Sequence, residues 1–271
     1  MTAQSRSMMP REHGAYAQLG LPLVAALAAS RPTSSSVCYA FAACAAFVAH
    51  EPALILFGHR GSRARRDSGA RARRWLAASL FAAAAAGAIA FAWSPTSRPW
   101  AALSAALGAA ATALAFRRQE RSLFGEALAS SALASAAMPA AIAGGLPWQN
   151  AVGIWGVFGA SFLVSTVEVR SVAHRPPSRA ARIATWGAAF AILAGVAAMR
   201  PLLALASLPI LAVVAYLVVR APSAAALRRL GWTLASSSVL TAAVVVAVLR
   251  APHQASSSTL GETNPSGYTN K

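Results

Sequence analysis

The sequence predicts an all-α, polytopic membrane protein with about nine transmembrane helices, its N-terminus inside and its C-terminus outside the membrane. Of its 271 residues, 57% are hydrophobic and only 11% are charged, against about 25% charged residues in soluble domains. The apolar residues form long stretches, and the basic residues gather in alternate connections between them. These observations argue against an ordinary soluble domain.

Nine apolar stretches can be drawn, each close to the ~20 residues that an α-helix needs to cross hydrocarbon. They run over residues 15–30, 36–58, 75–94, 99–116, 123–145, 149–169, 183–199, 201–219 and 231–250. We therefore expect a cytoplasmic segment over residues 1–14 and a transmembrane domain over residues 15–250. The polar tail, residues 251–271, lacks apolar periodicity and is predicted to be disordered.

The basic residues set the predicted orientation. With the N-terminus inside, 19 of the 24 Lys and Arg residues fall on the inner segments, which are residues 1–14, 59–74, 117–122, 170–182 and 220–230. This is the positive-inside bias of a multi-pass protein of the cell (inner, cytoplasmic) membrane. The net charge of +17 would suggest nucleic-acid binding in a soluble protein. Here it predicts membrane lipids and not nucleic acid as partners.

The first apolar stretch has a second interpretation. Residues 1–30 also resemble a signal peptide, with a basic start, an apolar centre and the string ALAAS at 26–30. The charged cluster Arg11-Glu12-His13 directly before the stretch favours a retained span, because a secretory n-region seldom carries Glu. Whether the segment is cleaved stays open.

Six of the seven acidic residues and four of the five histidines fall on the inner side, so any site is expected to open there. Three strings carry them: PREHGAY at 10–16, His50-Glu51-Pro52, and Glu168-Val169-Arg170. Ionisable groups at membrane depth usually face an interior or a wet cavity. We predict catalytic roles for His50, Glu51 and Glu168 around one shared cavity. The alternative is that each Glu is an interfacial anchor paired with a nearby Arg.

Two kinds of binding are predicted beside these residues. Glu12, His13 and Glu51 could ligate a divalent metal, although no HExxH spacing supports this and the cofactor stays open. Arg11, Arg60 and Arg170 are predicted to bind phosphate or another anion. The Arg-rich segment 59–74 also has a purely topological explanation.

Glu126 has a structural explanation as well. It falls in the first turns of the fifth stretch, beside Arg117, Arg118 and Arg121. A helix N-terminus favours an acidic side chain through the helix dipole. We therefore do not assign Glu126 to the predicted site.

The sequence resembles the YwiC-like family of bacterial membrane proteins. The strings PREHGAY at 10–16, AHEP at 49–52, GHRG at 58–61 and FLVSTVEVRSV at 162–172 carry the resemblance, which extends over roughly residues 8–250. The resemblance implies a membrane protein without implying a particular reaction.

The predicted architecture is also similar to that of UbiA-type intramembrane prenyltransferases, in which the loops after spans two and six bind Mg²⁺ and an isoprenyl diphosphate. Here span two ends in His50 and Glu51 instead of an Asp-rich run, and Val172 stands where a second acid would follow Glu168. The resemblance implies a membrane-embedded enzyme acting on a prenyl or lipidic substrate at the cytoplasmic face.

Two other classes of function remain open. A small-molecule transporter is favoured by short loops and by Pro22, Pro139 and Pro209 inside the stretches. It is opposed by the absence of ionisable residues near the middle of a span. A non-catalytic membrane assembly factor would use the arginines to bind acidic lipids or partners.

Overall fold

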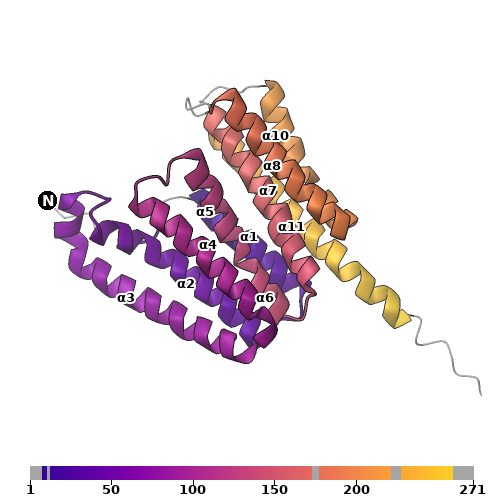
Figure 1. Ribbon diagram of the computed structural model, residues 1–271, viewed down its shortest axis with the longest axis horizontal. Helices are drawn as coiled ribbons and strands as arrows, with labels where there is room; N and C mark the ends of the chain where they lie inside the picture. The colour runs from indigo at the N-terminus through magenta and orange to yellow at the C-terminus, as the bar shows by residue number, and fades with distance from the viewer. Residues whose placement is uncertain (1–7, 11–12, 173–176, 221–226, 259–271) are drawn as a thin grey trace, which may run out of the picture.

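The computed structural model describes residues 8–10, 13–172, 177–220 and 227–258, and their side chains except those of His13, Leu227 and residues 252–258. Every regular element in these residues is a helix (Figure 1). They are α1 (His13–Ala29), α2 (Ser34–Leu56), α3 (Ser62–Trp93), the 3₁₀ turn η1 (Pro95–Ser97), α4 (Arg98–Phe116), α5 (Leu123–Ser135), α6 (Ala137–Ala143), α7 (Trp148–Val172), α8 (Arg179–Met199), α9 (Pro201–Leu205), α10 (Leu208–Arg220) and α11 (Leu227–Ser258). The predicted all-α class is confirmed.

Seven helical segments in the described part of the chain are long and apolar enough to cross a membrane. They are Ser34–Leu56, Ser62–Trp93, Pro95–Phe116, Leu123–Ala143, Trp148–Val172, Arg179–Met199 and Arg228–Ala251. The first and eighth predicted spans correspond to shorter apolar helices, Gly14–Ala29 and Leu208–Arg220. The structure thus has a membrane-type helical bundle, while the count of nine spans and the orientation remain predictions.

The Arg-rich connection after α2 differs from the expectation. We expected a connecting segment over residues 59–74, but α3 begins at Ser62 and continues without a break to Trp93. Arginine has a high helix propensity, so the basic segment extends the apolar helix by several turns. The arginines of this extension are therefore displayed along a helix.

Two predicted spans are interrupted. The fifth is divided at Ala136 into α5 and α6, and the eighth is divided after Leu205 into α9 and α10. Pro139 and Pro209 lie in the first turns of α6 and α10, where the missing N–H of proline leaves no helix bond broken. Pro22 lies inside α1, which continues through it.

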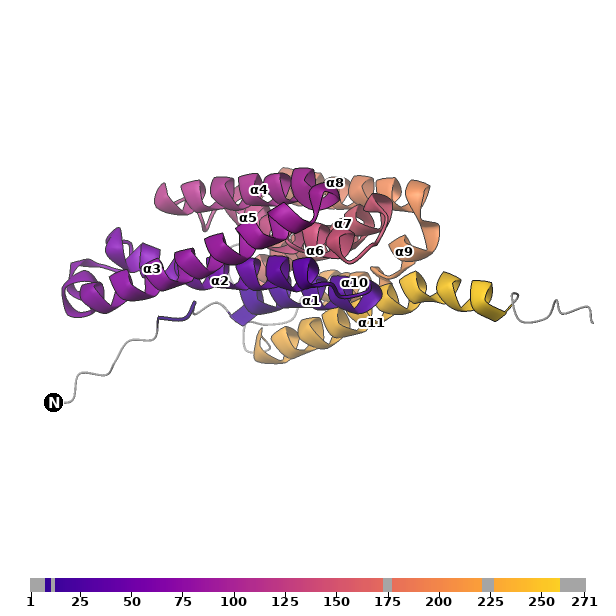
Figure 2. The same ribbon diagram turned by 90° about the horizontal axis from the view of Figure 1, so that it is seen from below.

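The helices form two groups that meet along α7 (Figure 1). In one group α2 and α3 form a long antiparallel hairpin beside α1, α4, α5 and α6, and in the other α8, α10 and α11 lie along α7. Figure 2 shows α1 and α11 side by side on one surface of the bundle. The largest buried core contains Ile154, Val157 and Phe158 of α7, Ala26 of α1 and Val245 of α11. α7 is therefore the central helix.

Candidate functional site

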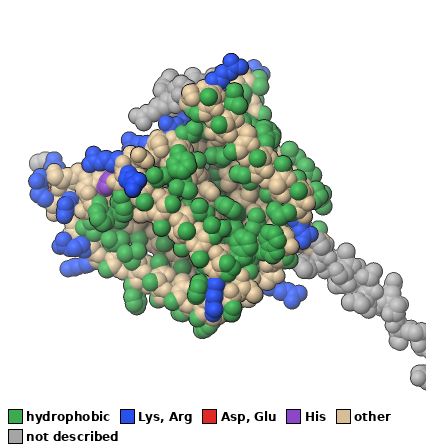
Figure 3. All heavy atoms as spheres, viewed as in Figure 1, with side chains coloured by type: hydrophobic (Ala, Val, Ile, Leu, Met, Phe, Trp, Pro, Cys, Tyr) green, Lys and Arg blue, Asp and Glu red, His purple; other side chains and the backbone are tan. Residues whose placement is uncertain are grey.

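The C-terminal ends of α2, α4 and α7 and the N-terminal ends of α3, α5 and α8 lie at one end of the bundle, which we call the Arg-rich end. Phe57 and His59, after α2, contact the ring of Phe116 at the end of α4, with ring centroids 4.6 and 6.0 Å apart. Arg170 of α7 donates to the carbonyl of Arg121 between α4 and α5 at 2.8 Å. Arginine side chains gather along the left and upper rim of the surface in Figure 3, where these helix ends lie. Three of the predicted inner segments thus meet.

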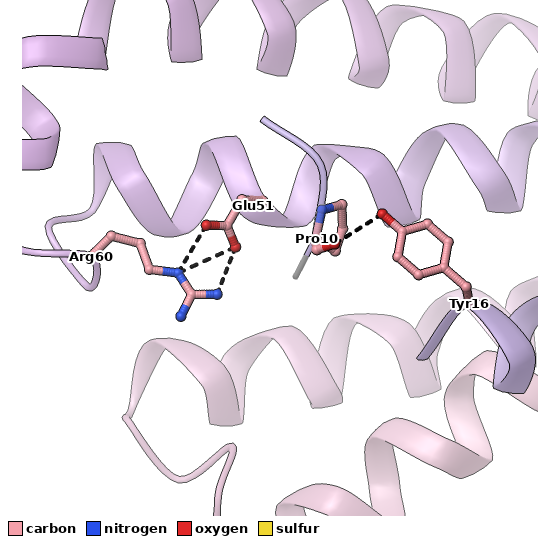
Figure 4. A network of polar contacts seen from close by, with 4 residues as sticks. All are labelled: Pro10, Tyr16, Glu51 and Arg60. Carbon is pink, nitrogen blue, oxygen red and sulfur yellow. Dashed lines mark hydrogen bonds and ion pairs between the residues drawn. The ribbon is translucent and has the colours of Figure 1, made fainter. Parts of the chain in front are cut away.

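Glu51 and Arg60 form the first of two buried ion pairs, which we call the first clasp. The carboxylate of Glu51 is 0% exposed. It accepts from Nε of Arg60 at 3.0 and 3.2 Å and from Nη2 at 2.6 Å (Figure 4). Gly58 and Gly61, with φ of 78° and 91°, form the turn that brings Arg60 back onto α2, in backbone conformations that glycine adopts without strain.

The N-terminal string lies beside the first clasp. The hydroxyl of Tyr16 donates to the carbonyl of Pro10 at 3.0 Å (Figure 4), and its ring packs edge-on against Phe47 of α2. Met8 is buried against Ile55 of α2 and Ala72 of α3. The structure therefore brings the first two sequence strings together at the α2–α3 hairpin.

Glu168, Arg182 and Trp186 form the second clasp, between α7 and α8. Glu168 is 2% exposed. It accepts from Nε and Nη2 of Arg182 at 2.7 and 2.6 Å and from the indole Nε1 of Trp186 at 2.9 Å. Ser178 caps α8 by accepting from the N–H of Ala181. Arg182 and Trp186 are four residues apart and so lie on the same face of α8.

A third ion pair joins α5 to α7 at the same end of the bundle. Nη1 of Arg170 is 2.8 Å from Oε1 of Glu126, and Glu126 lies in the first turn of α5 as predicted. Its partner is Arg170 and not one of the three arginines near it in sequence. Nε of Arg170 and Oε2 of Glu126 are buried with no hydrogen-bond partner in the described part of the structure. This pair ties α5 to α7 and engages one predicted anion-binding arginine.

The predicted site residues differ in their partners, their burial and whether the structure describes them. Glu51 and Glu168 are both buried, and each is paired with its own arginine. His50 is half-buried next to the first clasp on α2. Arg11 and Glu12 lie outside the described residues, as does the side chain of His13. Among the described residues, no three His, Cys, Asp or Glu side chains are grouped as a metal site.

Beside the second clasp is an open apolar groove of about 610 Å³ between α8 and α10. Its lining consists of Arg182, Ile183, Trp186, Gly187, Ala215, Val218 and Val219. Two of these residues, Arg182 and Trp186, also hold the carboxylate of Glu168. The second clasp therefore combines a buried carboxylate, a partly exposed guanidinium and an apolar surface.

The sequence interpretation did not include Arg182 and Trp186. Arg182 was counted only as one of the basic residues of an inner segment, and Trp186 as part of an apolar stretch. The available signal was their spacing of four residues at the start of a helix that follows Glu168. That spacing places a guanidinium and an indole N–H on one face, and both groups can donate to a carboxylate.

Comparison with known families supports the first of the two resemblances. Residues 9–142 match the family described as YwiC-like protein. The match ends within α6, at the last helix before α7, so it covers the helices of the first group and not the whole range over which we expected the resemblance. No curated protein and no solved structure matches the chain, and the similarity to UbiA-type enzymes remains a prediction. Residues 9–142, with α1 to α5, most of α6 and the first clasp, are thus similar to the YwiC-like family.

Proposed function

We propose that this protein binds a lipidic or prenyl substrate with an anionic head group at its Arg-rich end, and that this end faces the cytoplasm. One observation carries the proposal: Glu168, buried in the bundle, holds Arg182 at the edge of an apolar groove. A guanidinium beside an apolar surface matches the two halves of an amphiphile.

The roles of the glutamates follow from their partners. Each accepts two or more hydrogen bonds from a guanidinium, so each is best suited to fix its arginine. The second clasp keeps the Nη1 group of Arg182 in place for an anion, which lowers the entropy lost on binding. In this proposal Glu51 and Glu168 are positioning residues, and Arg182 is the group nearest to the head group.

A photo-crosslinking experiment tests the binding step. Membranes that contain the full chain are labelled with a photoactivatable isoprenyl phosphate and with phosphatidic acid carrying the same group on its acyl chain, beside the matching isoprenyl alcohol and diacylglycerol. We expect either phosphate-bearing probe to label the protein more strongly than its neutral analogue. Equal labelling by phosphate-bearing and neutral probes would contradict the proposal.

Complementation of a deletion strain tests whether the bound lipid is also modified. If Glu51 and Glu168 have the catalytic roles predicted from the sequence, Glu51→Gln and Glu168→Gln should abolish the activity while the protein remains in the membrane at normal abundance. Arg65→Gln serves as control because Arg65 is exposed on α3. Full activity of both Gln variants would remove the catalytic roles predicted for these residues. Topology reporters after residues 66, 120, 178 and 225 should report cytoplasm, and one after residue 260 the opposite side.

A transport function has two structural observations in its favour. The interrupted fifth span places the helix ends of α5 and α6 inside the bundle, and the hydroxyls of Ser161 and Thr241 near the middle of α7 and α11 are fully buried without described partners. Interrupted helices with polar groups at mid-depth are typical of transporters. Solute flux into proteoliposomes that depends on Ser161 would favour this alternative.

A further inference from the structure

The groove between α8 and α10 has the shape and charge of a lipid site. Ile183 and Val219 on its two sides are 62% and 81% exposed, and in a membrane such apolar faces contact lipid. A Cβ built on Gly187, in the groove, would meet no atom within 4 Å. The surface above this glycine is therefore open to an acyl chain.

The mouth of the groove is basic. Arg182 lines it with 36% of its side chain exposed. Arg179, one turn earlier on α8, is exposed, and so is Arg220, which follows Val219 at the end of α10. Neither α8 nor α10 contains an Asp or a Glu. Arg182, in the lining, therefore complements an anion, and its described carboxylate partner, Glu168, lies on α7. Arg179 and Arg220 add positive charge at the start of α8 and the end of α10.

The second clasp also fixes the wall of the groove. The indole N–H of Trp186 is bonded to Glu168, which limits the rotation of the ring. The ring of Phe190 lies 5.6 Å from it, one turn further along α8. From Arg182 to Phe190 the apolar surface extends for about 12 Å along the helix. This length receives the part of an acyl chain nearest to its head group.

We propose that this groove is a binding site for an anionic phospholipid, with the phosphate at Arg182 and one acyl chain along Trp186 and Gly187. The inference rests on the proposed function and names the substrate class and the place of binding. Arg182 forms its described bonds through Nε and Nη2, so the two N–H groups of Nη1 are not used in the clasp. A phosphate oxygen accepts such groups in a charge-assisted hydrogen bond.

The test uses the purified full chain in nanodiscs with photoactivatable phosphatidic acid or phosphatidylcholine of the same acyl chains. Cross-linked peptides from α8 and α10 are quantified by mass spectrometry for the wild type, Gly187→Leu and Arg182→Gln. Gly195→Leu is the matched control, because Gly195 lies two turns further along α8 and a Cβ there also meets no atom within 4 Å.

We expect phosphatidic acid to label α8 and α10 in the wild type and in Gly195→Leu, and labelling to fall about tenfold in Gly187→Leu and Arg182→Gln. Unchanged labelling in Gly187→Leu, or equal labelling by phosphatidylcholine, would overturn the proposal that the groove binds an anionic phospholipid. If the protein prefers phosphatidic acid to phosphatidylcholine but the cross-links lie on other helices, the proposed groove site fails and the proposed function stands. If it has no such preference, both fail.

Discussion

Each clasp pairs a buried glutamate with an arginine at the Arg-rich end of the bundle, but the two pairs differ in the helices they join and in the exposure of the arginine. The first joins Glu51 of α2 to Arg60 in the following turn, and Arg60 is 20% exposed. The second joins Glu168 of α7 to Arg182 inside the next helix, adds Trp186 as a third donor, and leaves Arg182 36% exposed beside a groove. The comparison suggests that the first clasp mainly holds a hairpin together, while the second also presents a cation to the lipid phase.

The largest expected effect comes from removing the arginines. Arg60→Ala leaves Glu51 as an uncompensated buried charge and should lower the free energy of unfolding by about 3–5 kcal/mol. Arg182→Ala should lower it by about 1–3 kcal/mol, because Trp186 still donates to Glu168 and water reaches the position more easily. Unfolding of the purified protein in mixed micelles with increasing SDS measures both values. Equal losses would remove the distinction between the clasps.

Glycines on the two hairpins provide the next comparison. A Cβ on Gly156 of α7 would overlap Val196 of α8, whereas a Cβ on Gly87 of α3 would be in ordinary contact with Ala42 of α2. Gly156→Ala should therefore lower the free energy of unfolding by about 1–3 kcal/mol. Gly87→Ala should leave it unchanged or raise it by about 0.5–1 kcal/mol through helix propensity. Thermal unfolding of the two variants in one detergent gives the comparison, and a stable Gly156→Ala protein would contradict the close approach of α7 and α8.

Trp186→Phe tests the contribution of the indole N–H, the third donor that the second clasp has and the first clasp lacks. The ring is largely kept, and one hydrogen bond to Glu168 is lost, so we expect a decrease of about 1–1.5 kcal/mol in the free energy of unfolding. Trp232→Phe is the control, since Trp232 is exposed on α11. If Trp186→Phe and Trp232→Phe unfold at the same SDS concentration, the indole bond contributes nothing measurable.

The smallest effect is expected at an exposed pair on the first hairpin. Nε of Arg63 lies 3.7 Å from Asp67 on α3, and both side chains are exposed. Asp67→Asn should change the free energy of unfolding by about 0.5 kcal/mol or less, as is usual for surface ion pairs. A loss comparable to that of Arg60→Ala would show that the basic extension of α3 is not solvated as the structure indicates.

Much of the fold follows from the pattern of the chain. Seven of the nine predicted spans correspond to helices that could cross a membrane, because a long apolar stretch has few other stable forms in lipid. The basic segment at 62–74 was misjudged, since charge density says where a segment lies and not whether it is helical. The interruption at Ala136 was only suggested by Pro139, because α1 continues through Pro22 in spite of the same residue type.

The sequence by itself determined the apolar helices and the segments in which the arginines are concentrated. It also determined which glutamates lie near these segments and need a positively charged partner. These features depend only on composition and on the order of residues along the chain. The tertiary structure decided which arginine meets each glutamate. Arg60 and Arg182 are 9 and 14 residues from their partners. Glu126 is paired with Arg170 on another helix and not with the arginines near it in sequence. The groove likewise exists only because α8 and α10 both pack on α7. Such contacts depend on the directions of packed helices, which no local pattern of residues specifies.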